Sequence, residues 1–363
     1  MTAAGNAPGP EDPPNLYVFR GQAAVLAVAF AGGWAASASG APAGWMSGAM
    51  IAVTAFAATG LAKPFAAPLR GFIVLLAGVS MGSGASPHAL AAFAHYPVSL
   101  AMMALALATM TASAYGVLVR SPGFSRQTAL YAAIPGALSY VFVAAQGTGA
   151  DMPRIAVAQV FRIFVLMAIV PLLAGRLAPI APIMTPHDSP LMTLALVAVA
   201  LAIAYGMTRL GLTAALLYAA IGVSVLAHGS GLAPGRPDPA IQIAAQALVG
   251  ARVGTRFIGF DWHLLRGVIV AASGAFVAAL AAAAAFAALT AAVIKVSFIQ
   301  ALVAFAPGGI EAMTMTAFAL GLDPLFVGAH HLARFLLISL TLPFLSKAAV
   351  VSRPRAADIP PSS

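Results

Sequence analysis

The sequence predicts an all-α protein, a polytopic bundle of transmembrane helices built from two homologous repeats. Three observations support this prediction. Of the 363 residues, 61% are hydrophobic and 7% are charged, whereas a soluble domain carries about 25% charged residues. Apolar runs of about 20 residues, the length that spans a bilayer, recur along the chain. The two halves also match each other at one offset, since Gly78 corresponds to Gly250, 172 positions later.

The matches between the halves fall mostly on helix breakers and charges, which hydrocarbon tolerates badly. No gap is needed between positions 78 and 171. The matched pairs are Gly78 and Gly250, Gly82 and Gly254, Pro135-Gly136 and Pro307-Gly308, Gly149 and Gly321, Asp151 and Asp323, Arg162 and Arg334, and Pro171 and Pro343. Many secondary transporters consist of two such repeats with their ligand site between them.

Each repeat offers six apolar segments. The first repeat gives 18–38, 44–62, 70–87, 97–119, 127–146 and 153–173, and the second gives 190–208, 212–230, 240–257, 267–290, 296–320 and 324–346. The chain therefore divides into a disordered N-terminus (1–17), a first membrane repeat (18–173), a linker (174–189), a second membrane repeat (190–346) and a cytoplasmic tail (347–363).

Loop charges predict the orientation. Basic residues in the 62–70 and 120–126 loops and in the tail place these segments in the cytoplasm, as expected in a bacterial inner membrane. The second half fits less well, because this orientation puts three basic residues outside: Arg209, Arg256 and Arg266. One segment per half could therefore be re-entrant or broken, and the glycines favour 78–84 and 250–256. Six spans per half would make the repeats parallel and five would make them inverted, and the pattern favours parallel.

Two proline-glycine breaks interrupt predicted spans, at Pro135-Gly136 and at Pro307-Gly308-Gly309. Proline removes a backbone hydrogen bond and glycine permits non-helical backbone. An interruption at membrane depth is tolerated only where it is buried in protein or lines a cavity. The sequence therefore predicts broken helices at both sites, with a kink for packing alone as the alternative.

Three charged residues are predicted to lie deep in the membrane. Asp323 begins the last span, and Arg334 follows 11 residues later, about 16 Å along a helix. Arg162 has the same spacing from Asp151, and Glu311 precedes Asp323 by 12 residues. Arginine at this depth must face protein, water or a counter-ion. One carboxylate for two arginines favours an anionic substrate, while a charge pair that only joins the repeats is the structural alternative.

The two repeats differ at several polar positions. Ser139 replaces the acid of Glu311 in the first repeat, and the adjacent His330 and His331 belong to the second repeat alone. Adjacent histidines point about 100° apart on a helix, a poor geometry for a metal. Hydrogen bonding to Glu311 or to a substrate is expected instead. No catalytic or nucleotide-binding motif is present, and we expect neither an enzyme nor a cofactor.

The stretch from Pro307 to Pro343 resembles the C-terminal signature of the AbrB-type membrane protein family of bacteria, which is also labelled ammonia monooxygenase. The signature positions are Pro307, Gly308, Gly309, Glu311, Met313, Asp323, His331 and Arg334. The resemblance covers about residues 20–346 and implies an integral inner-membrane protein with a role in regulating gene expression. Because the chain offers no DNA-binding module, such a role would be indirect and without nucleic-acid contact.

These observations predict a secondary transporter of a small, anionic metabolite. A membrane sensor that binds the same ligand and signals through a partner, and an intramembrane monooxygenase-like enzyme, are the alternatives. The expected partners are the lipid bilayer and a small-molecule ligand or ion, and a homo-oligomer stays open. The expected ligand-binding residues are Glu311, Arg334, Arg162, His331, His330, Asp323, Asp151, Pro307, Gly308, Gly309 and Ser139.

Overall fold

The described part of the chain is helical throughout, as predicted. The computed structural model describes residues 16–85, 96–136, 138–146, 148–177, 186–212 and 215–351. These residues form helices and no strand, with one isolated backbone bridge between His187 and Arg236. Most of the predicted disordered ends, residues 1–15 and 352–363, lie outside the described residues.

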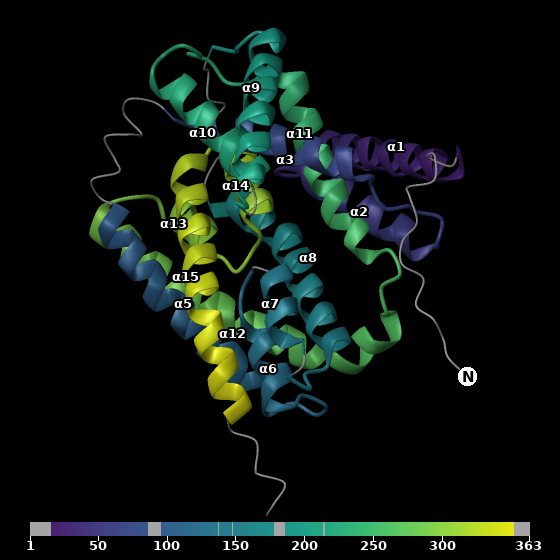
Figure 1. The fold of residues 1–363 in the computed structure, drawn as a ribbon, viewed down its shortest axis with the longest axis vertical. Helices are drawn as coiled ribbons and strands as arrows, with labels where there is room; N and C mark the ends of the chain where they lie inside the picture. The colour runs from purple at the N-terminus through teal and green to yellow at the C-terminus, as the bar shows by residue number, and fades with distance from the viewer. Residues whose placement is uncertain are drawn as a thin grey trace, which may run out of the picture.

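The helices follow one another along the chain in the same order in both halves (Figure 1). The first half contains α1 (Leu16–Ala38), α2 (Gly44–Ala58), α3 (Ala67–Gly82), α5 (Tyr96–Leu118), α6 (Arg126–Ala133), α7 (Leu138–Ala145) and α8 (Met152–Leu177). The second half contains α9 (Pro190–Arg209), α10 (Ala215–Gly229), α11 (Pro239–Gly254), a short 3-10 turn (Thr255–Phe257), α12 (Trp262–Ile294), α13 (Phe298–Phe305), α14 (Ile310–Ala319) and α15 (Pro324–Val351).

Helix starts repeat the offset seen in the sequence. The helices α6 and α13 start at residues 126 and 298, α7 and α14 at 138 and 310, and α8 and α15 at 152 and 324, so each pair is 172 apart. That the halves are homologous copies stays a prediction. The proposed boundaries are modified at three places, because α1 begins before residue 18, α8 runs into the predicted linker and α15 runs into the predicted tail.

Six of the described helices are long and apolar enough to cross a membrane, namely α1, α5, α8, α9, α12 and α15. The helices α2, α3 and α10 are shorter but also apolar. Large hydrophobic side chains stand on the outside of the bundle, such as Val270 at 84% and Leu210 at 80% exposure. Water would penalise such a surface, whereas lipid suits it. The chain is a multi-pass membrane protein by these criteria.

Both predicted helix breaks are confirmed. Helix α6 ends at Ala133 and α7 begins at Leu138, so the break contains Pro135 and Gly136. Gly136 has φ of 91°, a conformation that glycine adopts without strain. In the second half, α13 ends at Phe305 and α14 begins at Ile310.

The segments 78–84 and 250–256, proposed as re-entrant or broken, contain the ends of α3 and α11. Gly78 lies inside α3 and Gly250 inside α11, and each helix continues four residues further, to Gly82 and Gly254. These glycines let helices approach closely, as small residues do in membranes. A β-carbon at Gly78 would lie 2.6 Å from the Ala220 Cβ of α10, and one at Gly250 would lie 2.1 Å from the Met46 carbonyl of α2.

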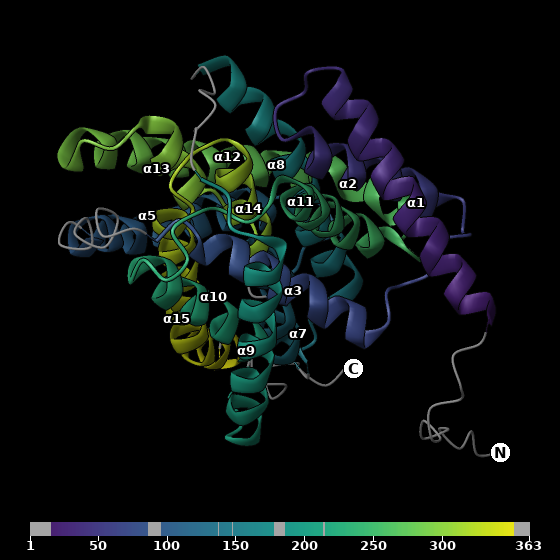
Figure 2. The ribbon, with the colours of Figure 1, turned by 90° about the horizontal axis from the view of Figure 1, so that it is seen from above.

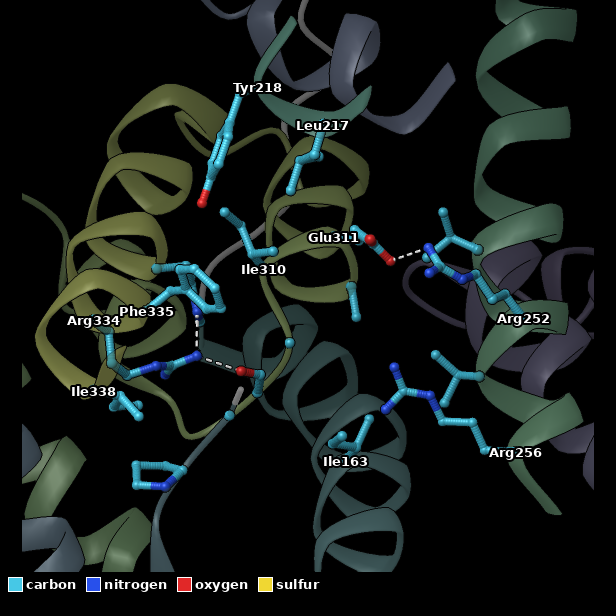
Figure 3. Close-up of a pocket in the computed structure, with 18 residues that line it drawn as sticks. Ile163, Leu217, Tyr218, Arg252, Arg256, Ile310, Glu311, Arg334, Phe335 and Ile338 are labelled. Atoms are coloured by element: carbon cyan, nitrogen blue, oxygen red, sulfur yellow. Dashed lines mark hydrogen bonds and ion pairs between the residues drawn. The ribbon is translucent and has the colours of Figure 1, made fainter. Parts of the chain in front are cut away.

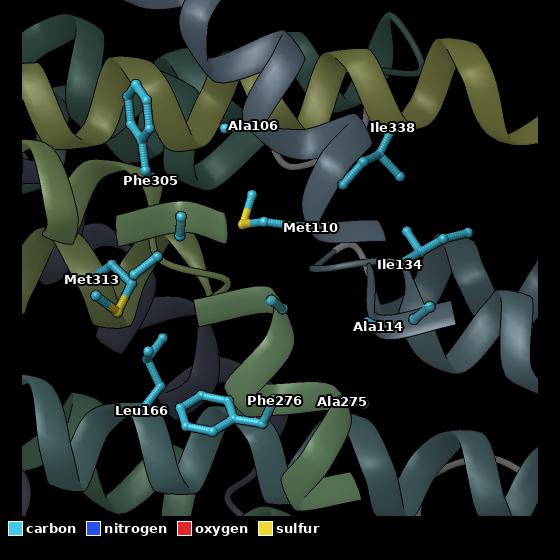
Figure 4. Packing of buried hydrophobic residues seen from close by; sticks show 14 of the residues in the cluster. Ala106, Met110, Ala114, Ile134, Leu166, Ala275, Phe276, Phe305, Met313 and Ile338 are labelled. Carbon is cyan, nitrogen blue, oxygen red and sulfur yellow. The ribbon is translucent and has the colours of Figure 1, made fainter. Parts of the chain in front are cut away.

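The two halves are interleaved in space. Helix α2 packs against α11, α3 against α10, and α5 against α12. Figure 2 shows α1 on one flank and α5, α12 and α13 on the opposite flank. The larger apolar core joins α5, α6, α8, α12, α13 and α15, and it includes Met110, Leu166, Phe276 and Phe305 (Figure 4). A second core joins α1, α2, α3 and α11 with parts of α8 and α14.

Candidate functional site

A cavity of about 290 Å³ lies between the two cores, where the helix breaks meet. Pro135 and Gly136 line it from the first half, and Gly308 and Gly309 from the second (Figure 3). In Figure 1, α6 and α7 lie in the lower part of the view, and α13 and α14 lie in the upper part. The two breaks therefore reach one cavity from opposite ends in this view. The parallel arrangement that the loop charges favoured stays a prediction.

Arg334 of α15 is fixed against the second break. Its side chain is 2% exposed, and it lines the cavity. One terminal nitrogen, Nη1, donates to the Ala306 carbonyl at 2.6 Å, and the other, Nη2, donates to the Gly308 carbonyl. A break in a helix frees backbone carbonyls that need donors inside a membrane. The arginine therefore supports the break and at the same time places positive charge at the cavity wall.

His331 holds the same arginine from its own helix. Nη2 of Arg334 lies 2.7 Å from Nδ1 of His331, and Nε2 of His331 lies 3.0 Å from the Val303 carbonyl. A guanidinium can only donate, so Nδ1 accepts and Nε2 carries the proton. These two contacts assign a neutral imidazole to His331. The predicted hydrogen bond to Glu311 is not among the described contacts of His331.

The first half repeats this arrangement incompletely. Arg162 of α8 donates from Nη1 to the Ile134 carbonyl at 3.3 Å, and Gln159 donates to the Tyr131 carbonyl at 3.0 Å. These residues occupy the positions 172 before Arg334, Ala306, His331 and Val303. Within the described residues, however, Nε and Nη2 of Arg162 have no hydrogen-bond partner, and neither has Oε1 of Gln159. Arg162 is buried behind its break and does not line the cavity.

Glu311 pairs with an arginine that the sequence interpretation did not select. Its Oε2 forms an ion pair and a hydrogen bond with Nη1 of Arg252, on α11. The two side chains are 23% and 26% exposed, and both line the cavity. The carboxylate at the start of α14 therefore does not neutralise Arg334 or Arg162. It lies across from α11 and joins that helix to the second break.

Arg256 is the second cationic residue that sequence reasoning missed. It follows Arg252 by four residues and points into the cavity in Figure 3. Among the described residues it forms neither a hydrogen bond nor a salt bridge. Loop charges had placed Arg256 outside the membrane, but the four-residue spacing puts both arginines on one helical face. That spacing was the available signal, and the glycines of the same segment obscured it.

The remaining predicted residues lie away from the cavity. Nε2 of His330 lies 2.8 Å from Oγ of Ser99. Asp323 caps α15, where its Oδ1 accepts from the Phe326 amide at 3.1 Å, and Asp151 caps α8 in the same way, accepting from the Arg154 amide at 3.0 Å. Pro307 opens the second break without lining the cavity. Ser139 begins α7 beside Leu138, and its side chain lies outside the described part of the chain.

The fold and site define a class, a helical membrane protein in which two interrupted helices meet at a charged internal cavity. Residues 45–349 match the family model described as "Transition state regulatory protein AbrB", and the chain belongs to this family. It is also similar to the "Uncharacterized protein YhjN" of Bacillus subtilis (strain 168), with 25% identity over 357 residues, which is 88% of this chain and 90% of that protein. The predicted family is thus confirmed, and neither name mentions a monooxygenase.

Proposed function

We propose that this protein is a secondary transporter of a small, anionic metabolite in the bacterial inner membrane. Helix breaks at the centre of a membrane protein are the usual site of substrates and coupling ions in such transporters. Here both breaks and the charged side chains of α11, α14 and α15 line one cavity. The chain's part in this proposal is binding and transport, without an enzymatic step or a cofactor.

The observation that carries the proposal is Arg256, an exposed cation of the cavity that forms no hydrogen bond or salt bridge among the described residues. The other two arginines of the cavity have partners, since Arg252 pairs with Glu311 and Arg334 donates to the second break. Arg256 points into the same cavity without a salt bridge (Figure 3). Its side chain is exposed, so an anion in the cavity can reach it. An anionic substrate would supply a counter-ion during each transport cycle.

A second candidate function is a membrane-embedded sensor. The printed description of the family calls it regulatory, which favours a chain that binds a ligand in this cavity and signals through a partner. Any effect on gene expression would then be indirect. The two candidates differ in one measurable property, because a transporter moves its ligand across the bilayer and a sensor only binds it.

Purified protein in liposomes tests the proposal. We expect uptake and counterflow of members of an organic-acid panel. Arg334→Ala and Glu311→Gln should each reduce uptake roughly tenfold to a hundredfold, the equivalent of one or two hydrogen bonds to a charged group. Arg266→Gln, on an exposed position of α12, is the matched control and should behave as the parent.

Two results would contradict the proposal that this protein is a transporter. Uptake that is unchanged in both cavity variants would place the substrate elsewhere. Saturable binding of an organic acid, measured in detergent, with no flux in liposomes would favour the sensor instead.

A further inference from the structure

We infer that the cavity selects an extended dianion, a molecule with two anionic groups at opposite ends of an apolar spacer, such as a dicarboxylate. This inference rests on the proposed function and specifies its substrate class. Three features of the cavity carry it: the sum of its charges, their separation, and the side chains between them.

The charges that line the cavity sum to two positive charges. Arg252, Arg256 and Arg334 contribute three positive charges and Glu311 contributes one negative charge, which leaves 3 − 1 = +2. His331 adds nothing, because its contacts assign it the neutral form. A monoanion would neutralise only one of these two positive charges. A dianion compensates both.

The positive charges stand on opposite walls. In Figure 3, Arg334 of α15 reaches the cavity on one side. Arg252 of α11 and Arg256 of the following 3-10 turn reach it on the other. The Arg334 guanidinium has five N–H groups, of which three donate to Ala306, Gly308 and His331. The two that remain, on Nε and Nη1, lie on different edges of the guanidinium, so one of them can donate to an anionic group. Arg256, without a partner of its own, can receive the second.

The space between the walls is largely apolar. Ile163 and Ile310 line the cavity between the charged groups, and Phe335 and Ile338 line it beside Arg334. Such a lining suits a hydrocarbon spacer better than a polyhydroxylated one, which would lose hydrogen bonds to water without replacement. The volume of about 290 Å³ lies at the lower end of small-molecule sites and fits a metabolite.

The test is competition for uptake of radiolabelled succinate into liposomes that contain the full-length protein. The competitors are the α,ω-dicarboxylates from malonate to adipate, the monocarboxylates of matching length, and sulfate as a compact dianion. We expect the best dicarboxylate to compete at least about tenfold more strongly than its monocarboxylate, since one additional charged contact contributes about 1.5–3 kcal/mol.

The variants assign this preference to the two walls. Arg256→Gln should reduce the preference for dicarboxylates to less than about threefold, while thermal stabilisation by the monocarboxylates persists as evidence of a folded cavity. Arg256→Lys keeps the charge and should keep the preference. Arg266→Gln removes an exposed arginine outside the cavity and should change neither property.

The other outcomes separate the inference from the proposed function. The inference of an extended dianion fails if monocarboxylates or sulfate compete as well as the dicarboxylates. It also fails if Arg256→Gln keeps the full preference for dicarboxylates. In both cases the proposed anion transport is unaffected. If no organic or inorganic anion is taken up or bound by the parent protein, the proposed function fails as well.

Discussion

The two halves share one backbone arrangement but not one set of charges. Arg162 and Arg334 each donate to the carbonyl that precedes the proline of their own break. Asp151 and Asp323 cap the helices that carry these arginines. The cavity charges nevertheless come from the second half, because Arg252, Arg256 and Glu311 correspond to Ser80, Gly84 and Ser139 in the first. The shared contacts support the helix breaks, and the residues found in one half only give the cavity its chemistry.

The largest expected difference between the halves is the change in stability when Arg334 or Arg162 is replaced. Arg334→Met removes three hydrogen bonds and leaves two break carbonyls without this donor, so we expect a loss of about 3–5 kcal/mol in stability. Arg162→Met removes one long hydrogen bond and two unpartnered nitrogens. Replacing such a buried charge with an apolar side chain should change stability by less than about 1 kcal/mol, or increase it.

Thermal unfolding of both variants in the same detergent checks this difference. Equal losses would mean that the two arginines have equivalent surroundings and that the asymmetry between the halves is smaller than their contacts indicate. A larger loss for Arg162→Met would reverse the comparison.

Much of this fold could be predicted from the sequence, because the free-energy cost of placing polar groups in lipid depends on residues that are close together in the sequence. Apolar runs gave the spans, and proline next to glycine gave both breaks. Counting from Asp323 gave the burial of Arg334, since depth along a helix depends only on its rise. Gly78 and Gly250 lie inside helices at close helix contacts. The sequence does not reveal this, because a break and a close contact both favour glycine and only the packing partner distinguishes them.

The site was harder to predict, since it depends on how helices from different halves are rotated toward each other. Glu311 lines the cavity, but its partner Arg252 is 59 residues away in the sequence on α11. Arg162 was proposed as a ligand residue from its matching position, and its side chain lines a small alanine-rich space instead of the main cavity. No periodicity in one helix reveals which neighbouring helix it faces.

An effect of intermediate size is expected from alanine substitutions at the close helix contacts of the two halves. Gly250→Ala would place a β-carbon 2.1 Å from the backbone carbonyl of Met46, and α2 and α11 would have to separate. The corresponding Gly78→Ala meets the Ala220 Cβ at 2.6 Å. We expect losses of about 1–3 kcal/mol, with the larger loss at Gly250, where backbone is in the way.

Gly267→Ala is the matched control, because a β-carbon there meets nothing within 4 Å. In thermal unfolding this variant should be as stable as the parent or more stable, since alanine favours a helix by about 1 kcal/mol over glycine. Stability that is unaffected in Gly250→Ala would show that α2 and α11 are not in close contact.

The smallest expected effect comes from giving His331 the residue of the first half. His331→Gln should keep a donor to the Val303 carbonyl, as Gln159 donates to the Tyr131 carbonyl. It loses the ring nitrogen that accepts from Arg334, one hydrogen bond of about 0.5–1.5 kcal/mol. Thermal unfolding against the exposed control His263→Gln measures this loss, and succinate uptake measures how far a less fixed Arg334 weakens the site. A loss within error in both assays would mean that the Nδ1 contact does not hold the arginine, and that Gln159 and His331 are interchangeable at the two breaks.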